Sequence, residues 1–316
     1  MPTLIAKLSL KQSLAEARAV AEKWRGSPSL SAHLTDFQGM FSKTVVVEME
    51  DGSEWVVQLR DNEIDTTKVA LAHAKLGAVV PLTYRTAPSK AYFAFIAPFV
   101  PGTVWINKDK LSTDVMVSIA TQIGRLLALC ALGESSVAMI DSYVVPRLQQ
   151  ILSRELGDQP HEPFQHKIKQ LMAQAADTKI LPLALIHEDV NSMNIILNDS
   201  NDIAALIDWE AASLLPLGTN GWCIRMLSTV NRQRIDYETE NTIPMARGFW
   251  RGFTANLPVA LQGRKDVLNA IVTAMQIGMV MFLFWPGNDG LSNDQMDQGV
   301  ARLNWFEDTF RPMANA

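Results

Sequence analysis

The hydrophobic and polar positions of the first hundred residues predict a mixture of helices and strands. Leucine and alanine recur at helical spacing after Ser9, and Gly26-Ser27-Pro28 is typical of a helix end. Two β-rich runs flank Asp51-Gly52, a pair that supplies the positive φ of a tight hairpin. The expected elements are a helix over Ser9–Trp24, strands over Lys43–Met49 and Glu54–Arg60, a helix over Thr66–Leu76 and a strand over Ala91–Phe99.

Beyond Gly102 the periodicity is mainly helical, with one small β region. The expected helices are Ser112–Leu132, Pro146–Leu156, His166–Ala176, Ile243–Phe253, Arg264–Phe284 and Asn293–Phe310. The expected strands are Leu183–Ile186, Asn194–Leu197 and Ile203–Ile207. The pattern predicts an α+β protein of two lobes, a small β-rich lobe over residues 1–100 and a larger helical lobe over residues 101–316.

One segment, Ala270–Pro286, is apolar enough to raise the question of a membrane span. It is slightly short for a span and is interrupted by Gln276 and Gly278. We therefore expect a buried core helix and no membrane association. The N-terminus mixes charged and apolar residues, which does not resemble a signal peptide.

Composition narrows the classes of partner. The net charge is -5 and charges of both signs are interspersed, so no basic field is available to bind a nucleic acid. The only cysteines, Cys130 and Cys223, are far apart, which argues against a disulfide framework or a zinc site. A reducing, cytoplasmic compartment fits this usage. The sequence does not indicate an oligomeric state.

Two motifs carry candidate chemistry. The first runs from His187 to Asn194, in a loop after a predicted strand, and the second is Ile207-Asp208-Trp209-Glu210. Phosphoryl transfer needs a group that orients or deprotonates the acceptor hydroxyl, and magnesium ligands that neutralise phosphate oxygens. In this interpretation Asp189 faces the hydroxyl, whereas Asn194 and Asp208 bind magnesium. His187 is expected to orient the loop.

In this order, the two motifs resemble those of the aminoglycoside phosphotransferases and their choline-kinase-like relatives. The family's catalytic loop reads HxDxxxxN, matched from His187 to Asn194, and its metal aspartate lies in an IDW[ED] run, matched at Asp208. Leu215-Pro216-Leu217-Gly218 looks similar to fungal members. The resemblance implies a protein-kinase-like fold, with ATP and Mg²⁺ as cofactors. It does not decide between ATP and GTP.

The N-terminal lobe agrees with the resemblance. Gly39, Phe41 and Ser42 lie in a segment similar to the family's phosphate-covering loop. Pro98 and Val100 lie in a segment that resembles the interlobe hinge, where adenine would form backbone hydrogen bonds. These five residues are therefore expected to bind the nucleotide.

Two positions depart from the family pattern. The strand lysine that holds the α- and β-phosphates is replaced by Arg60, which can bind phosphate bidentately. The helix glutamate that pairs with this cation falls near Lys68, with Glu63 and Asp65 as other candidates if the register differs. We therefore expect Arg60 to be positioned by phosphate or by another acid.

Glu188 adds a carboxylate beside Asp189. One hypothesis is that Glu188, Glu210 and Asp189 form an acidic floor that attracts a cationic acceptor and raises the pKa of Asp189. The other is that Glu188 is a solvent-facing variation without a role. No activation segment of the protein-kinase kind follows Asp208, which argues against a protein substrate.

The sequence thus predicts an ATP- and magnesium-dependent kinase of a small, hydroxyl-bearing metabolite or natural product. Two alternatives stay open: a kinase-like binding protein without phosphoryl transfer, and a fold recruited to a different reaction in natural-product metabolism. The shared motifs do not specify the acceptor, because family pockets are built from variable loops.

Overall fold

The computed structural model describes residues 8–35, 38, 42–86, 92–154, 161–232, 235–284 and 291–316. The chain divides into two compact units. The first comprises Met1–Gly102 together with Ala204–Glu210, and the second comprises Thr103–Ile203 and Ala211–Ala316. A short segment that the sequence analysis assigned to the C-terminal lobe therefore belongs to the N-terminal unit.

The first unit is built on a five-stranded antiparallel sheet with the strand order β1-β2-β3-β5-β4. Its elements before residue 102 are α1 (Leu10–Arg25), β1 (Ser29–Leu34), β2 (Ser42–Met49), β3 (Glu54–Arg60), α2 (Thr66–Leu76), η2 (Gly77–Val79), β4 (Tyr84–Arg85) and β5 (Phe93–Pro98). The chain returns to this unit along β10 (Ile203–Leu206) and leaves it at η6 (Trp209–Ala211).

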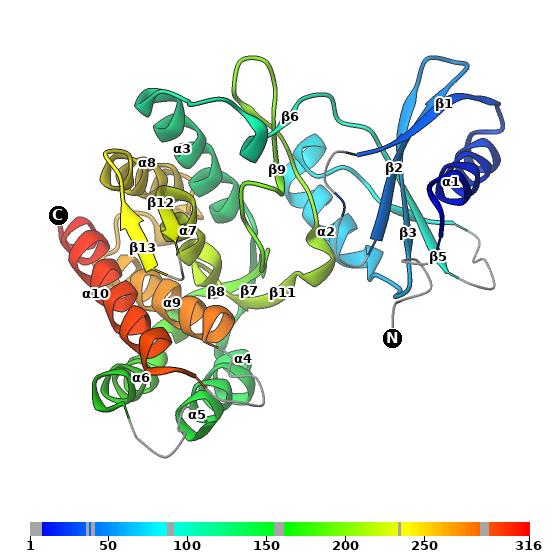
Figure 1. The fold of residues 1–316 in the computed structure, drawn as a ribbon. Coiled ribbons are helices and arrows are strands. Elements are labelled where there is room, and N and C mark those ends of the chain that lie inside the picture. Colours follow the sequence, from blue (N-terminus) through cyan, green and yellow to red (C-terminus); the bar gives the residue numbers. More distant parts are fainter. Residues whose placement is uncertain are drawn as a thin grey trace. The chain divides into compact units, whose positions relative to one another are not determined.

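Helix α1 packs along the sheet of the first unit (Figure 1). A capping box starts the helix, because the Ser9 hydroxyl accepts the N–H of Gln12 while the Gln12 side chain accepts the N–H of Ser9. Ala17 and Ala21 are fully buried in the same apolar cluster as Val45, Val57 and other inward-facing strand residues. This core fixes β2 and β3, the strands that carry Ser42 and Arg60 at their ends.

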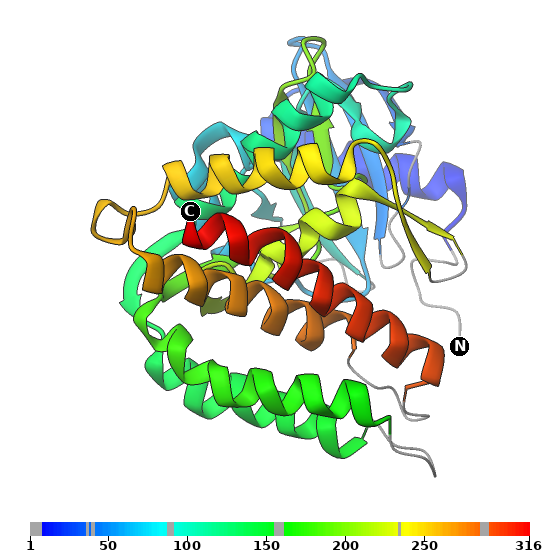
Figure 2. The same cartoon turned by 90° about the vertical axis from the view of Figure 1, so that its left-hand side faces the viewer.

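The second unit is mainly helical. Its larger helices are α3 (Thr113–Leu129), α5 (Val145–Arg154), α6 (Glu162–Gln174), α8 (Thr242–Ala255), α9 (Lys265–Leu283) and α10 (Asn293–Asn315). Its shorter helical elements are η3 (Trp105–Asn107), α4 (Val137–Met139), the π-helical η4 (Ile140–Val144), η5 (Ala175–Ile180), η7 (Thr219–Trp222), α7 (Cys223–Ser228) and η8 (Val259–Leu261). Figure 2 shows α8, α10, α9 and α6 as successive rods, from yellow through red and orange to green.

The strands of the second unit are short and antiparallel. They are β6 (Thr103–Val104), β7 (Ala131–Ser135), β8 (Pro182–Ile186), β9 (Ile195–Leu197), β11 (Ser213–Pro216), β12 (Thr229–Arg232) and β13 (Ile235–Glu238). Strand β8 is central in the order β11-β8-β7, β6 pairs with β9, and β12 pairs with β13. The loop with the first sequence motif thus connects the central strand β8 to β9.

Glycines allow α3 and α8 to pack closely. A Cβ atom added to Gly252 would lie 2.0 Å from the carbonyl oxygen of Thr121, and one added to Gly124 would lie 2.2 Å from that of Phe249. Only residues without a side chain fit at such distances.

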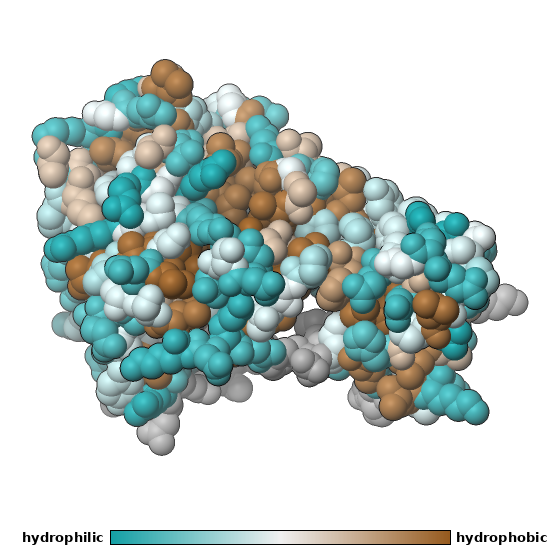
Figure 3. Space-filling model, turned by 90° about the horizontal axis from the view of Figure 1, so that it is seen from above, coloured by the Kyte–Doolittle hydropathy of each residue, from teal (hydrophilic) through white to brown (hydrophobic). Residues whose placement is uncertain are grey.

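Helix α9 is the one helix of the described residues that is long and apolar enough to cross a membrane, and 72% of the apolar window is buried. It lies in the core of the second unit, as the sequence predicts for a buried helix. The surface view presents hydrophilic residues interspersed with hydrophobic ones (Figure 3).

The predicted fold class is confirmed: the N-terminal part contains an antiparallel sheet and the remainder is mainly helical. Within the described residues the expected helices and strands are all present, with ends shifted by a few residues. Two predicted ends, Ala91 and Leu156, lie outside the described residues. The sequence did not predict β1, β4, β6, β7, β11, the β12–β13 hairpin or the short helices α4 and α7. The predicted Ser112–Leu132 helix ends at Leu129 because the chain continues as β7.

Candidate active site

The loop after β8 is held by a buried histidine. His187 is only 1% exposed and directly follows Ile186, which is equally buried at the end of the strand. The Nδ1 atom of His187 accepts the backbone N–H of Asp189 at 3.1 Å. The imidazole therefore fixes the turn that presents Asp189, which fits the positioning role expected from the sequence.

Two asparagines hold the carboxylate of Asp189. Asn191 Nδ2 donates to Oδ1 at 2.7 Å, and Asn194 Nδ2 donates to Oδ2 at 3.2 Å and to the backbone oxygen of Asp189 at 2.9 Å. Asn191 also accepts the N–H of Met193 at 2.8 Å, which closes the loop on itself. The Asp189 residue is exposed, so an oriented carboxylate faces solvent.

The sequence analysis missed Asn191. Its signal was local, because an asparagine two residues after an aspartate commonly forms such side-chain-to-backbone turns.

Asn194 lies at the entrance to β9 and is 9% exposed. The strand is fixed by pairing with β6, in the register Thr103 to Leu197 and Val104 to Ile196. Because the amide nitrogen of Asn194 donates to Asp189, its amide oxygen is the atom available by type to a metal ion.

Arg60 and Ser42 are direct neighbours across two strands of the first unit. Arg60 ends β3, Ser42 begins β2, and the two residues pair in the antiparallel register. Directly opposed residues project to the same face of a sheet. Both are buried, Arg60 at 6% and Ser42 at 9% exposure. The structure thus brings together two of the predicted nucleotide-binding residues.

The second motif also lies in the first unit, where it supplies an acid for Arg60. Arg60 Nη2 donates to Glu210 Oε1 at 2.5 Å. Trp209, between the two acids of the motif, is 2% exposed and donates its indole N–H to the Leu206 carbonyl at 2.9 Å, which anchors the turn. Asp208 has a φ of 69°, an uncommon value for a residue other than glycine.

Three charged groups determine the electrostatics of this turn. Burial raises the pKa of the Glu210 carboxyl above its ordinary value, and the neighbouring Asp208 charge raises it further, while Arg60 acts in the opposite direction. The net direction is upward, because desolvation and like charge together outweigh the guanidinium. The sequence suggested Glu210 as part of an acidic floor with Glu188 and Asp189. In the structure Glu210 forms an ion pair with Arg60, a partner that the sequence did not indicate.

The acids expected near the helix position have other partners. Glu63 forms an ion pair with Arg85, and Asp65 caps α2 by accepting the N–H of Thr67 at 3.0 Å. Lys68 lies in the first turn of α2, as the sequence register predicted. The α2 segment therefore provides no acid to Arg60 among these three positions.

The other predicted site residues are less informative. Gly39 and Phe41 lie outside the described residues. Pro98 ends β5, where it pairs with Trp55, and Val100 follows in the connection to the second unit. Glu188 is half-buried beside Asp189. Their roles stay predictions.

The described ranges contain no group of three or more His, Cys, Asp or Glu side chains placed to hold a metal ion. A magnesium ion bound to nucleotide phosphates needs only one or two protein carboxylates, since phosphates and water supply the other ligands. The oxygen donors of Asn194 and Asp208 are of the type that magnesium prefers.

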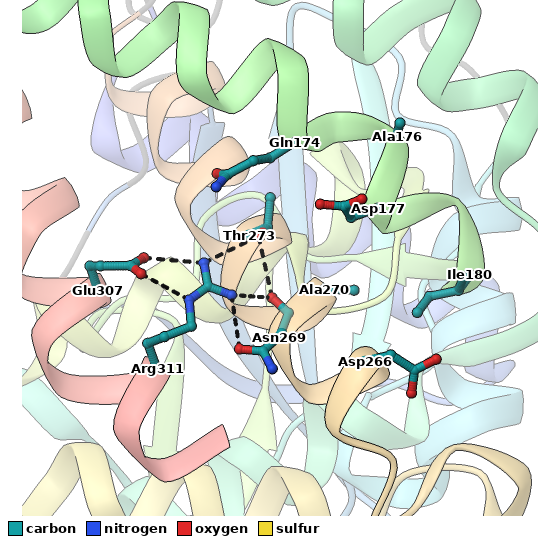
Figure 4. Close-up of a pocket in the computed structure, with 10 residues that line it drawn as sticks. All are labelled: Gln174, Ala176, Asp177, Ile180, Asp266, Asn269, Ala270, Thr273, Glu307 and Arg311. Carbon is teal, nitrogen blue, oxygen red and sulfur yellow. Dashed lines mark hydrogen bonds and ion pairs between the residues drawn. The ribbon is translucent and has the colours of Figure 1, made fainter. Parts of the chain in front are cut away.

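A cavity of about 480 Å³ lies in the second unit, among η5, α9 and α10 (Figure 4). Arg311 lies at its wall and donates to Glu307, to Thr273 and to both oxygens of Asn269. Its guanidinium is therefore satisfied by the protein itself. The cavity contains none of the residues predicted from the motifs.

The sequence profile described as "Phosphotransferase enzyme family" matches residues 34–233, which is 200 of the 316 residues. The chain belongs to this phosphotransferase family. The predicted family and the prediction of a small-molecule kinase are thereby confirmed. A search of curated proteins found no match. Nothing in these comparisons bears on the expected similarity to fungal members of the phosphotransferase family.

Solved structures show the same kinase-like fold. A macrolide 2'-phosphotransferase type I is 12% identical, with a TM-score of 0.58 and coverage of 96% of this chain and 99% of that chain. A thermostable mutant of aminoglycoside phosphotransferase APH(4)-Ia, in ternary complex with AMP-PNP and hygromycin B, is 13% identical, with a TM-score of 0.61 and coverage of 92% and 97%. A Plasmodium vivax ethanolamine kinase is 12% identical, with a TM-score of 0.50 and coverage of 89% and 84%.

Proposed function

We propose that this phosphotransferase transfers the γ-phosphoryl group of ATP, with magnesium, to a hydroxyl group of a small molecule. The observation that carries the proposal is the Asp189 carboxylate, exposed to solvent and held at both oxygens by Asn191 and Asn194. A carboxylate that is held in one orientation and open to solvent is what an acceptor hydroxyl requires.

Asp189 acts as the base in this reaction. The acceptor hydroxyl donates its hydrogen bond to Asp189, and its oxygen attacks the γ-phosphorus. The bond from this phosphorus to the bridging oxygen breaks, ADP leaves, and the hydroxyl proton passes to Asp189. The two asparagine N–H groups fix the carboxylate in one orientation, so little reorganisation is needed when the hydroxyl arrives.

Asn194 and Asp208 are the proposed magnesium ligands. When bound, magnesium neutralises negative charge on the transferred phosphate. The hydrogen bond from Asn194 Nδ2 to Asp189 supports this role, because it holds the proposed base and the proposed metal ligand together.

The residues of the first unit are the proposed nucleotide site. Arg60 and Ser42 on one sheet face bind phosphate oxygens, while Pro98 and Val100 offer backbone groups to adenine. ADP and AMP-PNP in the solved structures of spectinomycin and aminoglycoside phosphotransferases support a nucleotide of this kind. Their substrates and ethanolamine are small hydroxyl-bearing molecules, which supports the same acceptor class here. A cytoplasmic location, where ATP is available, stays a prediction.

The function is tested with labelled ATP, magnesium and a metabolite extract. Wild-type protein should form a labelled small molecule, and Asp189→Asn should abolish it, because the amide cannot take the hydroxyl proton. Asp199→Asn, the same substitution in the exposed turn after β9, is the matched control and should keep full activity. Full activity of Asp189→Asn would refute the role of Asp189. Nucleotide binding by wild-type protein without any labelled product would favour a binding protein instead.

A further inference from the structure

Arg60 is held by an acid that is distant in the sequence. Arg60 is buried at the end of β3, and its one hydrogen bond to an acid in the described chain goes to Glu210, 150 residues later. The side chain of Arg60 is 7% exposed and that of Glu210 is 22% exposed. Both residues lie in the first unit, so their contact belongs to one compact body.

The nearer acids are excluded by their own contacts. Glu63 is in an ion pair with Arg85, and the Asp65 carboxylate accepts the backbone N–H of Thr67 at the start of α2. Arg60 is thus paired with an acid from the IDWE turn. A buried guanidinium without an acid would be strongly unfavourable, so Glu210 replaces a partner that α2 does not supply.

The pairing leaves donors on Arg60. A guanidinium carries five N–H donors, whereas the contact with Glu210 uses Nη2. The buried Nε makes no hydrogen bond within the part of the chain that is described. Arg60 is therefore fixed in place but not saturated, a state suited to a second anionic partner.

The charge of the turn points to the same conclusion. Asp208 and Glu210 are two residues apart, so the turn carries two carboxylates of the same charge. Arg60 offsets part of this repulsion. Without Arg60, a nucleotide phosphate at this turn would lie near the carboxylates of Asp208 and Glu210 with no cation among these three residues to offset their charge.

We propose that Glu210 is the positioning residue of Arg60 and sets the affinity of the protein for nucleotide phosphates. The proposal rests on the proposed function, in which Arg60 binds those phosphates. Glu210 acts through Arg60 and does not itself need to touch the nucleotide or the metal. Its contribution is therefore independent of magnesium.

ADP binding measured by calorimetry in EDTA tests this inference. Wild-type protein should bind ADP, and Glu210→Gln should weaken binding about tenfold or more, since a charge-assisted hydrogen bond holds the guanidinium. Glu210→Asp, which keeps the charge, should recover part of the loss. Glu63→Gln, which removes an exposed acid with a different arginine partner, is the matched control and should bind as wild type does.

A double-mutant cycle separates positioning from direct contact. In an Arg60→Met background, Glu210→Gln should cause no further loss of ADP affinity, because both changes remove the same interaction. Additive losses, or a loss seen only with magnesium, would overturn the inference and indicate a metal ligand. If Glu210→Gln is unstable, Glu210→Asp takes its place in the cycle. It should bind ADP more weakly than wild type, and it should cause no further loss in the Arg60→Met background. Unchanged ADP binding in the Glu210 variants would overturn this inference alone, whereas wild-type protein that binds no nucleotide would overturn the proposed function as well.

Discussion

Two buried arginine clusters, one in each unit, differ in how completely their charges are matched. In the first unit Arg60 makes a single hydrogen bond to Glu210, which is partly exposed. In the second unit Arg302 binds Asp236 through two parallel hydrogen bonds of 2.6 and 2.8 Å, and the Asp236 side chain is 1% exposed. Asp236 thus accepts Arg302 at both of its carboxylate oxygens, whereas Glu210 accepts Arg60 at one.

The second cluster ties the β12–β13 hairpin to two helices. Arg225 on α7 lies 3.7 Å from Asp236 and donates to Glu238 at 2.9 Å, while Asn231 donates to Asp236 at 2.8 Å. The Arg225 guanidinium also lies over the Trp305 ring, 4.6 Å from its centre. A buried carboxylate that is bonded at both oxygens stabilises a structure, whereas the single bond to the partly exposed Glu210 leaves Arg60 able to bind an anionic ligand as well.

The largest effect is expected from Asp236→Asn. The change leaves two buried guanidinium groups without their shared acid, so the free energy of unfolding should fall by about 3–5 kcal/mol. Urea unfolding followed by tryptophan fluorescence measures the loss. ADP affinity should stay unchanged, because no described contact of Asp236 involves a proposed site residue. A loss of ADP affinity at unchanged stability would contradict the structural interpretation of this cluster.

The same carboxylate should make stability depend on pH. Burial alone would raise the pKa of Asp236, but the hydrogen bonds from Arg302 and Asn231 and the two arginine charges bring it below its ordinary value. A lowered pKa in the folded state contributes stability that is present above the ordinary value near 4, and that is lost as the pH falls through the folded pKa. The stability difference between wild type and Asp236→Asn should therefore shrink from pH 7 toward pH 3. A stability difference that stayed constant between pH 7 and pH 3 would contradict a lowered pKa of Asp236.

The pH dependence of stability that comes from Glu210 has the opposite sign to that from Asp236, because the pKa of Glu210 is raised in the folded state. Its protonation favours the folded state, so acidification costs no stability at this position.

A smaller loss of folding stability is expected from Arg60→Met. The Glu210 carboxyl left behind is partly exposed, so water can solvate its charge in place of the guanidinium. The free energy of unfolding should fall by only about 1–2 kcal/mol, while ADP affinity should fall strongly. Urea unfolding and calorimetry on the same sample compare the two losses. A loss of stability as large as that of Asp236→Asn would contradict the claim that the Arg60 pair contributes less to folding than the Asp236 cluster.

The sequence predicted what is encoded locally. The loop from His187 to Asn194 places His187, Asp189 and Asn194 within eight residues, so spacing alone brought them together. Helices such as α3 and α9 have long apolar patterns, which are reliable signals.

The missed features depend on distant or weakly patterned residues. The β12–β13 hairpin is mostly exposed, and its buried side chain is the polar Asp236, so it has no alternating apolar pattern. The pairing of Arg60 with Glu210 joins positions 150 residues apart, and no periodicity in either segment indicates it. Only the folded chain shows that the IDWE turn belongs with the N-terminal sheet.

That discontinuity has a consequence for biosynthesis. The first hundred residues leave the ribosome long before the segment from Ala204 to Glu210, which completes their unit. At about 5–20 residues per second, Arg60 waits roughly 8–30 s for its acid. An isolated N-terminal fragment, or a gene fusion joined at residue 102, would contain the arginine without its partner. Recombination can therefore exchange this unit only by moving two separate pieces of the gene.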